Sequence, residues 1–140
     1  MSTTPSFLLP PSSLNARTKG FALRIIRLYS ALPKRTEAQV LGKQLLRSGA
    51  SVGAHYREAV RARSDAEFIS KLEGGMQELE ESSYWLELLV EAEIFPSDKL
   101  APLRSEADEL MAILVTCVKN ARKKAGGERL RDEGGRRNKP

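Results

Sequence analysis

The chain has 140 residues and a net charge of +5, a length that suits one domain with one hydrophobic core. Its single cysteine, Cys117, excludes an intramolecular disulfide framework and a cysteine-rich zinc site. No apolar run approaches the roughly 18 residues of a membrane-spanning helix, and the N-terminus lacks the basic and apolar regions of a secretory signal, so we expect a cytoplasmic protein that does not bind a membrane.

Helices are predicted from the spacing of apolar residues and from the breaking and capping residues between them. The predicted helices cover about 14–32, 37–63, 65–94 and 97–124. Pro33 ends the first helix, and the capping-box patterns that begin at Thr36 and Ser64 start the second and the third. The FPSD stretch separates the third helix from the fourth.

No stretch alternates with period two, and the connections between the predicted helices are short. We therefore predict an all-α fold, an antiparallel up-down-up-down four-helix bundle over residues 14–124. Residues 1–13 are predicted to be a flexible N-terminal segment. Residues 125–140 are basic, Gly-rich and almost free of apolar side chains, which predicts a disordered basic tail.

The first predicted helix is apolar on two sides. Leu23 and Ile26 point away from the main apolar stripe, which contains Phe21 and Ile25. A helix that is apolar on two sides is buried on two sides, so we predict an oligomer interface at Leu23 and Ile26. The alternative is that the apolar N-terminal sequence SFLLPP folds back over them.

Two glycines, Gly49 and Gly53, lie inside the second predicted helix, in the sequence LLRSGASVGAHYREAVRARS. Each costs up to about 1 kcal/mol relative to Ala, which close helix packing can offset. With a turn at residue 64, antiparallel pairing places Gly53 level with Gly75, beside Gly74. We therefore predict one helix-crossing site formed by these four glycines. A phosphate-binding glycine loop would need a preceding strand, and none is predicted.

Charge is distributed unevenly along the chain. Residues 1–63 hold eleven Lys and Arg against two acidic residues, residues 64–121 hold four against 13, and residues 122–140 hold eight against three. The net charges of these segments are therefore +9, −9 and +5. The predicted bundle is close to neutral as a whole but strongly polarised.

The second and third predicted helices carry charged stripes of opposite sign. The basic stripe consists of Lys43, Arg47, Arg57 and Arg61. The acidic stripe consists of Glu73, Glu80, Glu87 and Glu91. Two interpretations remain open: the stripes pair with each other, within the bundle or between subunits, or the basic stripe binds the phosphates of nucleic acid.

The C-terminal region has fewer acidic competitors, which favours nucleic acid as its ligand. Its basic residues are Arg122, Lys123, Lys124, Arg129, Arg131, Arg136, Arg137 and Lys139.

Known catalytic classes of helical bundles fit the sequence poorly. A di-iron carboxylate site needs a Glu-x-x-His motif on each of two helices, and the chain has one histidine, His55. His55 and Cys117 both fall on inward stripes, where a core or interface role is favoured over catalysis. We expect no enzyme activity, no metal and no cofactor.

The sequence LLRSGASVGAHYREAVRARSDAEF resembles the central signature of a four-helix bundle protein family, which includes proteins encoded by intervening sequences of bacterial large-subunit ribosomal RNA genes. The positions that carry the resemblance are Arg47, Ser51, Val52, Tyr56, Glu58, Ala59, Arg61, Ser64, Glu67 and Phe68. ELEESSYWLELL resembles the family's third helix, and the resemblance covers about residues 15–122. His55 stands where the family usually has Asn, so a polar contact of that Asn is altered or moved here.

The resemblance implies an antiparallel four-helix bundle that assembles into a ring-like pentamer without known catalysis. Relatives include the accessory protein of diversity-generating retroelements, which binds a reverse transcriptase and nucleic acid through a basic surface. A ring needs a heterologous interface, in which one face meets a different face of the next copy. The oppositely charged segments of the chain would supply such faces.

Our hypothesis is a non-enzymatic, oligomeric helical-bundle protein that binds nucleic acid through its first two helices and its tail. The nucleic acid would be RNA, or an RNA–protein complex such as a reverse transcriptase complex. The competing hypothesis is a protein-interaction scaffold whose charged stripes serve self-assembly only. A third is a bundle that binds a small molecule.

Overall fold

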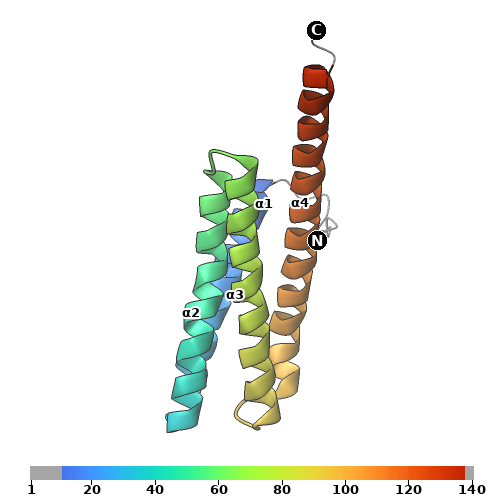
Figure 1. Ribbon diagram of the computed structural model, residues 1–140. Coiled ribbons are helices and arrows are strands. Elements are labelled where there is room, and N and C mark those ends of the chain that lie inside the picture. The colour runs from blue at the N-terminus through green and yellow to red at the C-terminus, as the bar shows by residue number, and fades with distance from the viewer. Residues whose placement is uncertain (1–10, 138–140) are drawn as a thin grey trace, which may run out of the picture.

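The computed structural model describes residues 11–137, with side chains at residues 13–127. This part of the chain contains four α-helices and no strand, which confirms the all-helical prediction (Figure 1). The helices are α1 (Pro11–Ala31), α2 (Thr36–Val60), α3 (Asp65–Glu91) and α4 (Ser97–Arg137). None of them is long and apolar enough to cross a membrane.

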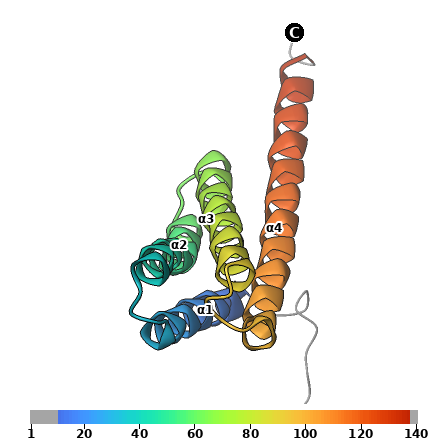
Figure 2. The ribbon, with the colours of Figure 1, turned by 90° about the horizontal axis from the view of Figure 1, so that it is seen from below.

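The core lies between neighbouring helices. The backbone of α1 lies close to those of α2 and α4, and the backbone of α3 lies close to those of α2 and α4 (Figure 2). No Cα atom of the described part of α1 lies within 8 Å of a Cα atom of α3. The predicted inward stripes supply the centre of the core, because Ile25, Val52, Leu79 and Leu110 are all fully buried. The helices therefore fold over the apolar faces that their sequence periodicity predicts.

The order of contacts along α2 and α3 is reversed. Glu58, late in α2, forms an ion pair with Lys71, early in α3, whereas Arg47 reaches Glu81 further along α3. The two helices thus run in opposite directions, as the turn predicted at residue 64 requires. Ser64 caps α3 by accepting a hydrogen bond from the backbone N–H of Glu67 at 3.1 Å.

The capping box predicted at Thr36 does not form. Arg35 is the N-cap residue of α2 and makes no side-chain capping bond. Gln39 instead donates to the carbonyl oxygen of Pro33 at 2.9 Å and accepts from the Tyr29 hydroxyl at 3.0 Å. The side chain that was expected to cap α2 therefore ties the α1–α2 connection to α1.

The C-terminal region differs most from the prediction. α4 continues to Arg137, past the end expected near Lys124, and projects beyond the α2–α3 turn (Figure 1). A low apolar content does not oppose helix formation, because Arg, Lys, Glu and Ala have high helix propensity.

The first helix, α1, begins at Pro11, about three residues before the predicted start. Proline is favoured at the first position of a helix. Residues 1–10 and 138–140 lie outside the described residues.

The glycines lie at two helix crossings rather than the single one predicted. A Cβ atom on Gly49 would overlap Cδ1 of Ile25, and one on Gly53 would lie 3.1 Å from the Thr18 hydroxyl, so both face α1. A Cβ atom on Gly74 would lie 2.9 Å from the His55 ring, and one on Gly75 would lie 3.6 Å from the Val52 carbonyl oxygen, so both face α2. Gly53 and Gly75 do lie at a similar height along the bundle, as predicted. The predicted contact between Gly53 and α3 is wrong, because Gly53 faces Thr18 of α1.

Candidate nucleic-acid interface

The outer face of α2 is basic. Lys43, Arg57 and Arg61 are exposed and lie opposite the buried stripe that contains Leu45 and Val52. Among the described residues, none of these three cations has an ion-pair partner. Ala50 and Ala54 lie between Lys43 and the two arginines and have small exposed side chains, so the sugar-phosphate backbone of a nucleic acid could approach this part of the helix closely. This face therefore presents positive charge that the bundle itself does not neutralise.

Arg47, the fourth member of the predicted stripe, is used differently. Its guanidinium group donates to Glu81 at 2.6 Å and lies 3.2 Å from Glu78, both on α3. The hydrogen bond from Arg47 lowers the pKa of Glu81, and a second hydrogen bond from the Trp85 indole contributes. Arg47 therefore pairs with glutamates that lie outside the predicted acidic stripe. The other three cations of the basic stripe have no ion-pair partner among the described residues, and nucleic acid as their ligand stays a prediction.

The basic residues of α4 also divide into two groups. Arg122 donates to Glu73 on α3 at 3.0 Å, whereas Lys123 and Lys124 are exposed without an ion-pair partner in the described part of the chain. The side chains of the others lie outside the described residues, although their backbone belongs to α4; these are Arg129, Arg131, Arg136 and Arg137. The projecting end of α4 therefore places several basic residues on one continuous helix.

Two ion pairs between helices involve residues outside the predicted charged stripes. Arg17 on α1 binds Glu106 on α4 with both side chains less than one-fifth exposed, and Glu58 binds Lys71 at 2.8 Å. The Glu106 hydrogen bond raises the pKa of Arg17, which keeps this cation charged. Arg17 and Lys71 are therefore already paired with carboxylates and are less available to bind a ligand.

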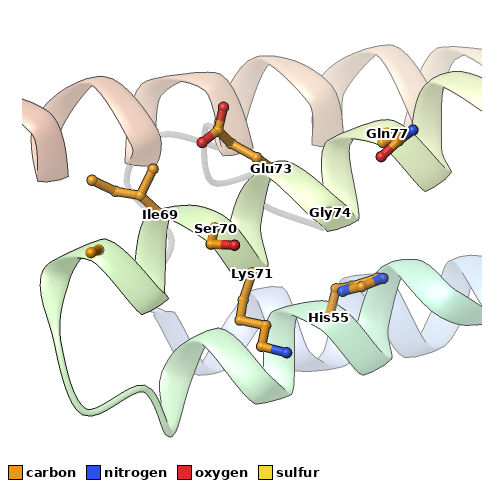
Figure 3. Close-up of a pocket in the computed structure, with 8 residues that line it drawn as sticks. His55, Ile69, Ser70, Lys71, Glu73, Gly74 and Gln77 are labelled. Carbon is orange, nitrogen blue, oxygen red and sulfur yellow. The ribbon is translucent and has the colours of Figure 1, made fainter.

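His55 lies at the seam between α2 and α3, against the backbone of Gly74 (Figure 3). Its Nδ1 atom is buried and has no hydrogen-bond partner. An open groove beside it is lined by Ser70, Lys71 and Gln77 of α3 among others. No cluster of His, Cys, Asp and Glu side chains in the described residues could hold a metal ion. His55 was predicted to be a hydrogen-bonded core or interface residue; it packs at the α2–α3 seam but is only partly buried, and its Nδ1 atom makes no hydrogen bond.

Cys117 is half-buried against the core from α4, as its inward position predicts. Burial raises the pKa of its thiol, which disfavours the reactive thiolate.

Leu23 and Ile26 are 41% and 45% exposed in a single chain. The bundle therefore leaves uncovered the two side chains that were predicted to form an oligomer interface.

Comparisons with known proteins agree with the helical architecture. The family model for the 23S rRNA-intervening sequence protein matches residues 14–116. A crystal structure of a protein of unknown function from the S23 ribosomal protein family of Bacteroides thetaiotaomicron is similar, with a TM-score of 0.73 and 36% identity, and the match covers 78% of this chain and 97% of that one. No curated protein matches the chain. The chain belongs to the 23S rRNA-intervening sequence protein family.

Proposed function

We propose that this protein is a non-enzymatic, homo-oligomeric helical bundle that binds nucleic acid through the outer face of α2 and the projecting end of α4. The observation that carries the proposal is the exposure of Lys43, Arg57 and Arg61 without any acidic partner among the described residues. Neighbouring cations such as Arg47 have such partners. Unneutralised cations on one helix face attract phosphate and release counterions when it binds.

RNA is the preferred ligand class in this proposal. The family is named for sequences that interrupt 23S ribosomal RNA, which associates it with RNA and would place its action in the bacterial cytoplasm. The partner would be structured RNA or an RNA–protein complex, such as a reverse transcriptase complex. The reversed contact order of α2 and α3 supports the antiparallel up-down-up-down arrangement, and the family resemblance favours a ring-like pentamer.

A charge-matched pair of variants tests the proposed surface. Lys43→Gln/Arg57→Gln/Arg61→Gln should lower the affinity for a structured RNA at least tenfold, because three phosphate contacts are removed. The control, Lys34→Gln/Lys99→Gln/Arg104→Gln, removes the same net charge from elsewhere and should retain most of the affinity. Equal losses in the two variants would show that net charge, and not the α2 face, determines binding.

The competing candidate is a protein-interaction scaffold whose charges serve self-assembly only. The exposure of Leu23 and Ile26 favours contact with another protein surface. Under this alternative, reversing the charge of Arg61 breaks the oligomer. Under the nucleic-acid proposal, Arg61→Glu weakens RNA binding and leaves the mass of the oligomer unchanged.

A further inference from the structure

The N-terminal end of α1 lies beside α4 in both views of the bundle (Figure 1, Figure 2). Arg17 binds Glu106 and lies 3.5 Å from Glu109, so the first turns of α1 pack against the middle of α4. Pro11, where α1 begins, lies six residues before Arg17, or about 9 Å along the helix axis. The residues before Pro11 therefore join the bundle next to α4.

An apolar strip of α4 continues past this contact. Ile113 follows Glu106 by seven residues and Glu109 by four, so it lies on the same side of α4 as these two partners of α1. Cys117 and Ala121 continue the strip at a spacing of four residues. All three side chains are only partly buried, and Ile113 and Cys117 pack against the edge of the core. We refer to Ile113, Cys117 and Ala121 as the α4 strip.

Helix α1 is too short to cover the α4 strip. Ile113 lies about 10.5 Å beyond Glu106 along α4, and Cys117 lies about 16.5 Å beyond it. Helix α1 extends only about 9 Å from Arg17 to its first residue, Pro11. It therefore ends near the height of Ile113, and the rest of the α4 strip needs another cover.

The sequence before α1 has the composition and the length to supply this cover. Phe7, Leu8 and Leu9 are three consecutive apolar residues. Fully extended, the chain from Pro11 back to Phe7 spans about 14 Å. The α4 strip is about 12 Å long from Ile113 to Ala121, so the three apolar side chains can reach all of it.

Two prolines favour an extended chain at this point. Leu9 and Pro10 each precede a proline, a position that disfavours the helical conformation. The sequence therefore opposes a backward extension of α1 and favours an extended connection. Such a restricted chain loses less conformational entropy when it docks than a freely flexible one.

The exposed side chains of Leu23 and Ile26 are a less suitable position for the N-terminal sequence. Leu23 lies about 18 Å from Pro11 along α1, and Ile26 lies about 22 Å from it. Both distances exceed the roughly 14 Å that the chain from Pro11 to Phe7 can span. The α4 strip, in contrast, begins close to Pro11.

We infer that Phe7, Leu8 and Leu9 form an N-terminal strap that docks on the α4 strip of the same chain and shields the Cys117 thiol. The burial of apolar side chains on both surfaces stabilises the contact, and the short tether keeps the effective concentration of the strap high. The inference concerns a single chain and rests neither on the proposed binding of nucleic acid nor on the proposed oligomer.

The reactivity of Cys117, the only cysteine in the chain, tests the strap. Phe7→Ser/Leu8→Ser/Leu9→Ser should increase the rate of its reaction with the disulfide reagent DTNB at least about fivefold, because solvent access and the thiolate fraction both rise. Val40→Ser is the control, since it removes an apolar side chain that is 54% exposed on α2. It should leave the rate unchanged. Circular dichroism would verify that both variants remain helical.

A cross-link measures the same contact in a second way. Leu8→Cys should form an intramolecular disulfide with Cys117 under mild oxidation with copper phenanthroline, detected by mass spectrometry as the loss of two hydrogens. Lys34→Cys, on the exposed α1–α2 connection, is the control and should form no intramolecular disulfide.

Three results would overturn the inference. The first is a wild-type thiol that reacts as fast as that of the serine variant, and the second is a Leu8→Cys variant that forms no intramolecular disulfide. The third is a wild-type reaction rate that falls as the protein concentration rises, which would show that a neighbouring copy shields Cys117 instead of the strap. The binding of RNA is measured separately, and its presence or absence leaves these three results unchanged.

Discussion

At the scale of single residues, Gly49 has the most demanding position in the α1–α2 crossing. It is buried, and an added Cβ atom would overlap Cδ1 of Ile25, which is itself fully buried. The close approach of the two helices depends on this absence of a side chain. The helix-propensity cost of a mid-helix glycine is about 1 kcal/mol, and the packing it permits offsets that cost.

We expect Gly49→Ala to destabilise the protein by about 1–3 kcal/mol, because overpacking exceeds the gain in helix propensity. Urea unfolding followed by circular dichroism measures the change. Ile25→Val removes the overlapping methyl group, so it should recover part of the loss in the double variant. Gly20→Ala is the control, since a Cβ atom there meets nothing within 4 Å and should stabilise α1. A neutral Gly49→Ala would contradict the close crossing.

The Arg47–Glu81 pair predicts a dependence of stability on pH. The folded-state pKa of Glu81 lies below its ordinary value of 4.5 because Arg47 donates to it. The pair therefore stabilises the fold fully above pH 4.5, and this contribution is lost as the pH falls through the lower folded-state pKa. Thermal unfolding should show Arg47→Gln less stable than the wild type at pH 7, with the difference shrinking below pH 4.5.

Arg57→Gln is the control for this pH experiment, because Arg57 has no ion-pair partner in the described part of the chain. Its melting temperature should follow that of the wild type at every pH. The same two variants should behave in the opposite way toward RNA, with Arg57→Gln weakening binding and Arg47→Gln leaving it nearly unchanged. A constant stability difference for Arg47→Gln across the acid range would contradict the assigned pair.

At the scale of helices and turns, the α3–α4 connection contains a residue in an unfavourable backbone conformation. Glu93 has φ 57°, and it is the residue after the C-cap Ala92. Its neighbours Ile94 and Phe95 both donate their backbone N–H groups to the Leu89 carbonyl oxygen, at 3.0 and 3.1 Å. This left-handed position at the end of a helix is where glycine is preferred.

Glu93→Gly should therefore stabilise the protein by about 1 kcal/mol, because the left-handed conformation then carries no Cβ penalty. Chemical denaturation gives the free energy of unfolding. Glu80→Gly is the matched control at an exposed position inside α3 and should destabilise by about 1 kcal/mol. Destabilisation by both substitutions would show that Glu93 does not hold the left-handed conformation in solution.

Sequence periodicity predicts the positions of the helices and the faces that they bury, because the burial of apolar side chains largely determines both. Ile25, Leu79 and Leu110 all lie in the core where the stripes place them. It does not predict which neighbour a face meets, since a small residue such as Gly53 is compatible with α1 and α3 alike. The end of α4 differs from its prediction for another reason: low apolar content predicts disorder, but Arg, Lys and Glu have high helix propensity and the helix continues to Arg137.

At the scale of the whole molecule, two surfaces present basic residues to a ligand in our proposal. The outer face of α2 carries cations without ion-pair partners among the described residues, and α4 extends basic residues away from the bundle (Figure 1). The ion-pair partners of Arg47 and Arg17 could not be read from the sequence, because many glutamates lie at compatible spacings. The folded bundle shows which cations form ion pairs between helices and which have no ion-pair partner among the described residues.

The most direct measurement of the central claim is the salt dependence of RNA binding by the full chain. The logarithm of the binding constant for a structured RNA should fall linearly with the logarithm of salt concentration, with a slope set by the number of phosphates contacted. Lys43→Gln/Arg57→Gln/Arg61→Gln should have a shallower slope as well as lower affinity. No binding at about 50 mM salt, or binding that salt leaves unchanged, would contradict the claim that the α2 face binds nucleic acid.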